Sequence, residues 1–175
     1  MFSLHVLHTN DDDPKKCTAR KLHRLGYVTL HKNSRELPSK MILLNPFSKK
    51  SISPEDISQA RKHGILAVDC SWKNAEEQFS ELSKNQLSRS LPFLIAVNPV
   101  NFGKPLKLTT LEAFTAAVYI LDEREQAKKL TSIYKWSPHF LTMNKNPLED
   151  YRTATSSKQV IERMYEYLPL DEDEI

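Results

Sequence analysis

The sequence predicts an α/β fold, in which a five-stranded parallel sheet is followed by an all-helical part. Short apolar segments alternate with segments of helical periodicity as far as residue 97, as in strand–helix–strand units with right-handed crossovers. Beyond residue 108 nearly every segment is helical or loop. We therefore expect an α/β domain with a basic surface over residues 1–92, a helical domain over 93–168 and a solvated acidic tail over 169–175.

The five strands are expected where short apolar runs end at a turn or a proline. The most apolar run follows Gly64, and four apolar residues in succession are typical of a strand buried on both faces. Asn-Pro pairs end two other runs, because proline cannot donate to a sheet ladder. The expected strands are Phe2–His8, Tyr27–Leu30, Met41–Leu44, Ile65–Asp69 and Leu91–Val97.

Helix starts are marked by capping residues, by proline in the first turn or by a capping box. Glycine marks two of the helix ends. The expected helices start at Asp13-Pro14, Ser53-Pro54, Trp72 and Thr109-Thr110-Leu111-Glu112, and the first two end before Gly26 and Gly64.

Composition excludes several classes of protein. No apolar run approaches the roughly 20 residues that span a bilayer, and residues 1–8 are too short and mixed for a signal peptide. Cys17 and Cys70 offer neither a disulfide framework nor metal-ligand spacing, and the six histidines form no H-x-x-x-H pair. We therefore expect a cytoplasmic protein with no bound metal and no membrane partner.

The 175 residues carry a net charge of +3 that is unevenly distributed. Residues 1–68 contain 12 Lys and Arg against 6 Asp and Glu, whereas residues 69–175 contain 13 against 16. The basic first part, which also holds five of the six histidines, favours a polyanionic partner, although solubility alone is an alternative explanation. With three glycines and no G-x-G-x-x-G or P-loop pattern, any nucleotide-like cofactor must be held in another way.

Three residues are candidates for a binding or catalytic site, and each has a structural alternative. Asp69 follows a buried strand, where open α/β sheets bind ligands, or it caps the next helix. Thr18 faces the sheet and could hold a ligand carboxylate, or it bonds back to its own helix. Trp72 is a platform for an adenine or a sulfonium methyl group, or a core residue.

Basic and aromatic residues offer further candidates for contacts with RNA. Lys16, Arg20 and Arg24 form a stripe on the first helix, which either binds an anion or is an ordinary solvated face. In the helical part, Trp136, His139 and Phe140 either stack on bases or belong to the core, and we favour the core. The chain lacks a G-x-S-x-G nucleophile elbow, which argues against a hydrolase.

Four segments together resemble one known family. They are Asp-Pro-Lys-Lys-Cys-Thr-Ala-Arg-Lys-Leu (13–22), Ala-Val-Asp-Cys-Ser-Trp (67–72), Leu-Pro-Phe-Leu-Ile-Ala-Val-Asn-Pro-Val-Asn-Phe-Gly (91–103) and Leu-Thr-Thr-Leu-Glu-Ala-Phe (108–114). In this succession the chain resembles the small-subunit ribosomal RNA aminocarboxypropyltransferases over residues 4–161, and its lack of long charged tails resembles archaeal members. The resemblance implies a SPOUT-like fold with a deep trefoil knot. It also implies transfer of the 3-amino-3-carboxypropyl group from S-adenosylmethionine to N3 of an N1-methylated pseudouridine during ribosome biogenesis.

The same resemblance assigns residues to the cofactor site. Adenine would lie among Leu44, Pro46, Trp72 and Leu91, and Thr18 would contact the amino acid end. The full implied set is Thr18, Leu44, Pro46, Val68, Trp72, Ala75, Leu91, Leu108, Thr110 and Ala113. We expect Asp69 either to act as a general base or to pair with the ammonium of the transferred chain.

Charge and position suggest which residues hold the phosphates of small-subunit rRNA or of a pre-ribosomal particle: Lys15, Lys16, Arg20, Arg24, Lys49 and Lys50. Two alternatives to the transferase are a SPOUT-type rRNA methyltransferase and a non-catalytic RNA-binding assembly factor. The helical part could complete the site within one chain, so we expect a monomer.

Overall fold

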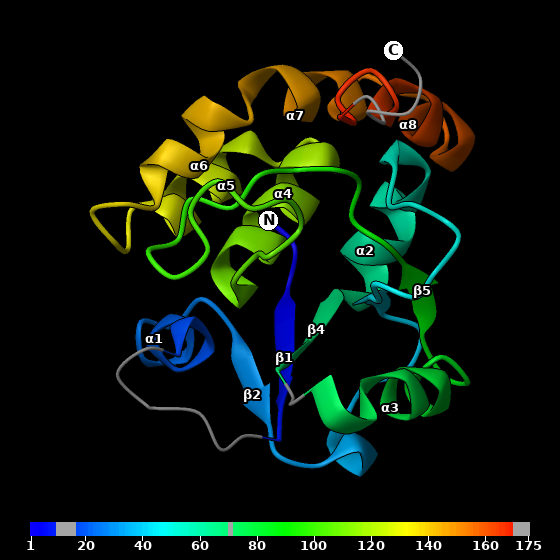
Figure 1. Cartoon of the computed structure of the whole chain (residues 1–175). Coiled ribbons are helices and arrows are strands. Elements are labelled where there is room, and N and C mark those ends of the chain that lie inside the picture. Colours follow the sequence, from blue (N-terminus) through cyan, green and yellow to red (C-terminus); the bar gives the residue numbers. More distant parts are fainter. Residues whose placement is uncertain (10–16, 70–71, 170–175) are drawn as a thin grey trace.

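Five parallel strands form one sheet in the order β2-β1-β4-β3-β5, as expected from the alternation of strands and helices (Figure 1). The structure is a computed structural model that describes residues 1–9, 17–69 and 72–169, with the backbone alone for Trp72. The strands are β1 (Leu4–His8), β2 (Thr29–His31), β3 (Ile42–Leu44), β4 (Ile65–Asp69) and β5 (Leu87–Arg89).

β1 and β4 pair along their whole length, from Leu4 opposite Ile65 to His8 opposite Asp69. Both lie inside the sheet, which explains the apolar run of β4, while β1 contains His5 and His8 among its leucine and valine residues. Because the register is continuous, the last residues of the two strands lie side by side at the carboxyl edge of the sheet.

The expected fifth strand, Leu91–Val97, is wrong, because β5 is Leu87–Arg89. β5 lies at the sheet edge with β3 as its one partner and is half-buried, so it needs no apolar run. Within Leu91–Val97, Leu94, Ala96 and Val97 are buried, but the segment makes only an isolated bridge, between Ile95 and Pro105. Its apolar pattern therefore reflects packing outside the sheet.

Helices cover both faces of the sheet. Along the strands, Leu4, Val6 and Ile65 belong to the large core that also contains α1, α2 and α4, whereas Leu7 and Leu66 pack with α3. The helices on or near the sheet are α1 (Thr18–Arg24), α2 (Ile57–His63), α3 (Ala75–Leu82) and α4 (Thr110–Ile120), with short 3-10 turns η1 (Ser34–Glu36), η2 (Pro54–Asp56) and η3 (Trp72–Asn74).

Several helix boundaries test the sequence signals. α4 starts at the expected capping box, in which Thr109 and Glu112 exchange hydrogen bonds. α1 starts later than expected, at Thr18, and the proposed start at Asp13 and Pro14 lies outside the described residues. The expected helix at Trp72 begins as the 3-10 turn η3, and the α-helix follows from Ala75.

The remaining helices, α5 (Arg124–Thr131), α6 (Pro138–Met143), α7 (Lys145–Arg152) and α8 (Ser157–Met164), form an arc over one end of the sheet (Figure 1). Their buried side chains, among them Leu130, Phe140 and Val160, belong to the same core as β1 and β4. The two expected parts of the chain therefore share one continuous core. The domain boundary between residues 92 and 93 stays a prediction. None of the described helices combines the length and apolar character needed to cross a bilayer.

Candidate active site

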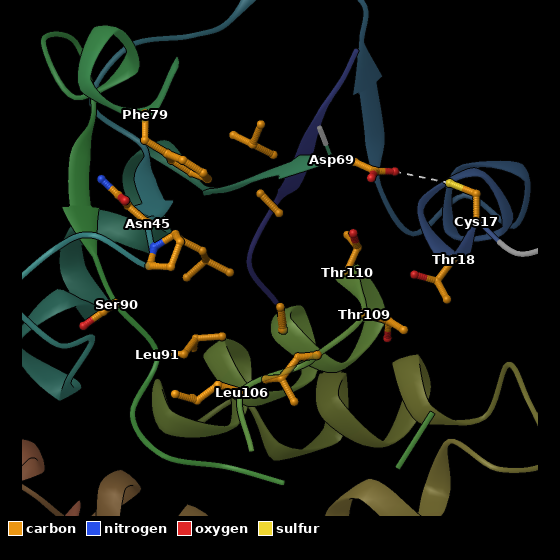
Figure 2. Close-up of a pocket in the computed structure, with 16 residues that line it drawn as sticks. Cys17, Thr18, Asn45, Asp69, Phe79, Ser90, Leu91, Leu106, Thr109 and Thr110 are labelled. Carbon is orange, nitrogen blue, oxygen red and sulfur yellow. Dashed lines mark hydrogen bonds between the residues drawn. The ribbon is translucent and has the colours of Figure 1, made fainter. Parts of the chain in front are cut away.

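A cavity of about 600 Å³ opens at the carboxyl edge of the sheet, which is within the roughly 300–1,000 Å³ usual for small-molecule sites (Figure 2). The ends of β3 and β4 and the first residues of α1 and α4 contribute to its wall. Helix N-termini and strand carboxyl ends are where α/β proteins commonly bind anionic and nucleotide-like ligands. The lining residues are Cys17, Thr18, Leu44, Asn45, Pro46, Ala67, Val68, Asp69, Phe79, Ser90, Leu91, Leu106, Leu108, Thr109, Thr110 and Ala113.

Most residues that the sequence assigned to a cofactor lie around this cavity. Thr18, Leu44, Pro46, Val68, Leu91, Leu108, Thr110 and Ala113 line it together with Asp69. Ala75 is buried between α3 and the sheet and is not among the lining residues. The side chain of Trp72 lies outside the described part of the structure, so its role stays a prediction.

Thr18 connects two helices at the cavity wall. Its hydroxyl oxygen accepts a hydrogen bond from the Leu111 N–H of α4 at 3.3 Å, and the side chain is buried. A bond back to its own helix would end on the carbonyl of residue 14, which is not among the described residues. Because the hydroxyl keeps its proton while accepting from Leu111, it can still donate to a ligand carboxylate.

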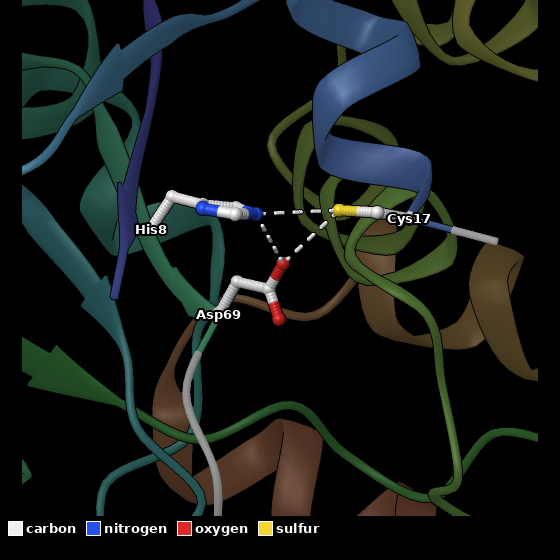
Figure 3. A group of neighbouring side chains, drawn as sticks. All are labelled: His8, Cys17 and Asp69. Atoms are coloured by element: carbon white, nitrogen blue, oxygen red, sulfur yellow. Dashed lines mark hydrogen bonds and ion pairs between the residues drawn. The ribbon is translucent and has the colours of Figure 1, made fainter. Parts of the chain in front are cut away.

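Asp69 lies in a cluster with His8 and Cys17, two residues that the sequence did not connect to it (Figure 3). The Cys17 thiol donates to Asp69 Oδ2 at 3.3 Å, and His8 Nε2 lies 3.4 Å from the same oxygen. His8 Nε2 and Cys17 Sγ are 3.4 Å apart. Burial, with the negative charge of Asp69, raises the pKa of the Cys17 thiol, so the thiol keeps its proton.

This cluster also contains the atoms that divalent metals take as ligands, a histidine nitrogen, a sulfur and a carboxylate oxygen. The sequence predicted no metal because it contains no ligand residues at the close spacing of a metal motif, whereas Cys17 and Asp69 are 52 residues apart. The one signal that could have found the cluster is that two parallel strands end in His8 and Asp69. The absence of a metal stays a prediction.

The buried Glu112 carboxylate holds the segment that forms the lower wall of the cavity. Its Oε1 accepts from the backbone N–H groups of Val97 at 2.7 Å and Asn98 at 3.0 Å. Its Oε2 accepts from Asn98 Nδ2 at 2.9 Å and from Thr109 N and Oγ1 at 2.8 and 3.0 Å. Five donors thus fix residues 97–109 to the start of α4, and the sequence signal at Glu112 indicated the capping bond alone.

The candidate RNA-binding residues lie on two sides of the cavity. Arg20 and Arg24 are exposed on α1, which begins at the cavity wall, and Lys49 and Lys50 are exposed in the segment that follows Pro46. Lys15 and Lys16 lie outside the described residues. The described basic residues therefore lie on the two chain segments that contribute Thr18 and Pro46 to the cavity wall.

The structure separates the three aromatic candidates. Phe140 is fully buried in the core, and half-buried Trp136 stacks on Tyr134 with ring centroids 5.1 Å apart. His139 is exposed, and its ring is parallel to that of exposed Phe102. The interpretation as core residues is therefore confirmed for Phe140 and is wrong for His139.

Comparisons with known proteins agree with this architecture. The family described as "Ribosome biogenesis protein, C-terminal" matches residues 42–168. The 16S rRNA aminocarboxypropyltransferase of Methanopyrus kandleri is 45% identical over 94% of this chain and 97% of its own. The protein of the same name from Methanocaldococcus jannaschii is 45% identical over 96% of this chain and 97% of its own.

A second family, described as "Possible Fer4-like domain in RNase L inhibitor, RLI", matches residues 2–36. Iron–sulfur clusters take several cysteine ligands, and Cys17 is the only cysteine among residues 2–36. This segment therefore does not supply the ligand set of such a cluster.

A solved structure has the same fold over nearly the whole chain. The structure of the "SAM-dependent rRNA:acp-transferase Tsr3 from Vulcanisaeta distributa" matches with a TM-score of 0.84 and 34% identity, covering 95% of each chain. Since both the sequence and the fold agree from end to end, the chain belongs to the 16S rRNA aminocarboxypropyltransferase family.

Proposed function

We propose that this chain transfers the 3-amino-3-carboxypropyl group of S-adenosylmethionine to N3 of an N1-methylated pseudouridine in small-subunit rRNA during ribosome biogenesis. One observation carries the proposal. The single cavity wall that contains Asp69 also contains Thr18, Leu44, Pro46 and Leu91, which the family resemblance had assigned to the cofactor. Relatives that are 45% identical over 94% and 96% of this chain are named 16S rRNA aminocarboxypropyltransferases.

The chemistry of the wall supports one orientation of the cofactor. Leu44, Pro46 and Leu91 offer apolar surface for the adenine, and the backbone near Leu108 offers polar groups for its edge. Thr18, at the start of α1, would donate its hydroxyl proton to the carboxylate at the amino acid end.

The position of the sulfonium decides which group is transferred. Substitution needs the nucleophile in line with the departing sulfur, so the carbon that faces the RNA is the one attacked. We propose that the methyl group points towards Trp72 and Ala75, where η3 passes into α3 next to Asp69, and that the aminocarboxypropyl chain faces the RNA. The N3–C bond forms as the C–S bond breaks, its electrons remain on sulfur, and methylthioadenosine leaves.

Two roles for Asp69 are compatible with its place in the wall. As a general base it would take the N3 proton while the new bond forms, which is worth roughly 10²–10⁴-fold in rate. Alternatively it would pair with the ammonium of the transferred chain. Asp69→Asn with normal cofactor binding and lost turnover supports the base, whereas lost binding supports the ammonium pair.

Two isotopic labels separate the transferase from its alternatives. S-adenosylmethionine labelled in the carboxyl carbon or in the methyl group is incubated with the purified protein and small-subunit rRNA that carries the N1-methylated pseudouridine but lacks the aminocarboxypropyl group. Carboxyl label in the RNA is the expected result. Methyl label would establish a methyltransferase instead, and no label in either experiment would leave a non-catalytic RNA-binding factor.

Charge reversal tests the proposed RNA surface. Arg20→Glu with Arg24→Glu should weaken RNA binding and lower the salt dependence of its affinity, because two phosphate contacts are lost. The matched control reverses Arg124 and Lys128, which are exposed at the same spacing on α5. α5 packs at the opposite end of β1, where Gln126 bonds to the Phe2 backbone. Equal losses in both double variants would contradict a surface at α1.

The finer features that the family resemblance implies are part of the same proposal. They are a deep trefoil knot in a SPOUT-like fold, an archaeal-type chain, a boundary between residues 92 and 93, and a cytoplasmic monomer that binds rRNA or a pre-ribosomal particle without a metal. The contribution of both the sheet and α4 of one chain to the cavity wall supports the monomer. Light scattering during size-exclusion chromatography tests it, and a dimer mass would contradict it.

A further inference from the structure

We propose that His8 and Cys17 are positioning residues, which bind one oxygen of the Asp69 carboxylate and thereby direct its other oxygen at the substrate. The inference deepens the proposed function and rests on its assignment of Asp69. It assigns a role to a histidine outside the cavity wall and to a thiol that is otherwise unexplained.

The contacts of the carboxylate are one-sided. Both the Cys17 thiol, at 3.3 Å, and His8 Nε2, at 3.4 Å, approach Oδ2, whereas Oδ1 points away from both (Figure 3). Oδ1 accepts no hydrogen bond from the side chains of the described residues. Rotation of the carboxylate about its Cβ–Cγ bond would break both contacts together, so the pair selects one orientation.

The backbone brings these three side chains together from different parts of the chain. His8 and Asp69 are paired in the register of β1 and β4, and Cys17 is the residue before α1. Thr9 strengthens this end of the ladder, since its N–H donates to the Asp69 carbonyl at 3.2 Å and its hydroxyl lies 3.3 Å from the same atom. The carboxylate is therefore fixed from β1, β4 and α1 at once.

His8 acts from behind the site. Its side chain is 9% exposed, against 19% for Asp69, and it is not among the residues that line the cavity. Any effect of His8 on the reaction must therefore pass through Cys17 or Asp69. Cys17 does line the cavity, but its thiol is directed at Asp69 Oδ2 (Figure 2).

The contacts within the cluster are those of hydrogen-bonding side chains. Burial and the neighbouring Asp69 raise the pKa of the Cys17 thiol, which therefore keeps its proton and donates to Oδ2. All three separations, from 3.3 to 3.4 Å, are consistent with weak contacts among a thiol, an imidazole and a carboxylate. His8 Nε2 is hydrogen-bonded to Cys17 Sγ and lies 3.4 Å from Oδ2, so it holds the thiol and the carboxylate oxygen together.

The orientation matters for both roles of Asp69. If Asp69 is the base, Oδ1 must face the N3 proton. If Asp69 pairs with the ammonium, Oδ1 must hold the transferred chain so that its reacting carbon stays in line with the nucleophile. Misplacement of a reacting group by about 1 Å can cost roughly 10²-fold in rate. We therefore expect loss of either contact to lower the single-turnover rate by about 10-fold and loss of both by about 100-fold.

The experiment removes each contact and then restores it. His8→Leu and Cys17→Ala remove the contacts, while His8→Gln and Cys17→Ser keep an N–H or O–H at a similar reach. We expect the first pair to lose rate and the second pair to recover most of it. His63→Gln, the same exchange at the opposite end of β4, is the matched control and should leave the rate unchanged. Should His8→Leu not fold, His8→Asn, whose amide is too short to reach Oδ2, takes its place.

A double-mutant cycle shows whether the effect passes through Asp69. In an Asp69→Asn background, His8→Leu and Cys17→Ala should cost no further rate, because the group that they orient is gone. Additive losses would overturn the proposal, since they would indicate a general structural role. The melting temperature and the dissociation constant for S-adenosylmethionine, measured for each variant, separate misfolding and lost binding from lost orientation.

Four outcomes distinguish this proposal from the proposed function. An Asp69→Asn variant with full activity overturns the positioning role and both proposed roles of Asp69, whereas the absence of carboxyl label in the RNA overturns the proposed function. Lost activity in Asp69→Asn with wild-type rates for His8→Leu and Cys17→Ala overturns the positioning role alone. One zinc ion per purified chain, whose removal by a chelator abolishes turnover, would also overturn it by making the cluster a metal site.

Discussion

Glu112→Gln should destabilise the chain strongly, although the two side chains have nearly the same shape. The carboxylate accepts two backbone N–H groups on Oε1 and three donors on Oε2. An amide has one oxygen, so even its better orientation points an NH₂ group at the N–H groups of Val97 and Asn98. With about 1.5–3 kcal/mol for each hydrogen bond to a charged group, the loss is about 3–6 kcal/mol.

That loss is large compared with the roughly 5–15 kcal/mol that stabilises most domains. Urea unfolding followed by circular dichroism measures it, and a titration with S-adenosylmethionine measures the accompanying loss of affinity as residues 106–110 shift. The control is Glu125→Gln, which removes an exposed charge paired with Lys128 and should change stability by less than about 1 kcal/mol. If the free energy of unfolding of Glu112→Gln lies within about 1 kcal/mol of the wild-type value, the five-donor account is refuted.

Two further predictions concern the backbone and pH. Gly64→Ala should destabilise by several kcal/mol in urea, because φ is +91° and a Cβ would lie 2.9 Å from the Ser3 carbonyl oxygen, whereas Gly26→Ala, at φ +81° with open space, should cost about 1–2 kcal/mol. Equal costs would contradict the steric argument. Burial and the charge of His31, whose Nε2 lies 3.0 Å from His5 Nδ1, lower the pKa of His5 from 6.5. Below that pH the unfolded chain takes up a proton that the folded chain resists, so stability should fall on acidification by up to about 1.4 kcal/mol per pH unit. The fall should be shallower in His31→Asn, and unfolding curves at a series of pH values that show the same slope for both proteins would contradict it.

Local signals in the sequence predicted local structure well. The capping box at Thr109 and Glu112 identified the start of α4, and the apolar run after Gly64 identified β4 with Asp69 at its end. Both depend on residues close together in the chain. The same holds for the end of α1 before Gly26, where a positive φ favours glycine.

Features that depend on tertiary contacts were predicted less well. Leu91–Val97 has the composition of a buried strand, but its burial comes from α6 and α7, where Asn144 bonds to both backbone groups of Ile95 and Tyr151 donates to the Phe93 carbonyl. The true edge strand, β5, carries no such signal. Apolar character indicates burial, and it does not by itself say which partner buries a segment.

The candidate site shows the same division. The residues taken from the family resemblance lie largely around one cavity, whereas Asn45, Phe79 and Ser90 were not expected there. His8 and Cys17 were missed because their contact with Asp69 follows from the register of β1 with β4 and from the position of α1. No spacing within a single sequence expresses that register.

The continuous core has a consequence for how the chain responds to its cofactor. The cavity is bounded by strand ends on one side and by α4 on the other, and α4 belongs to the same buried cluster as β1, α7 and α8. A molecule bound in the cavity contacts both the strand ends and α4, and it therefore links the first and last parts of the chain. Cofactor binding therefore raises the free energy of unfolding of the entire chain, by about 2.7 kcal/mol when the cofactor is present at 100 times its dissociation constant.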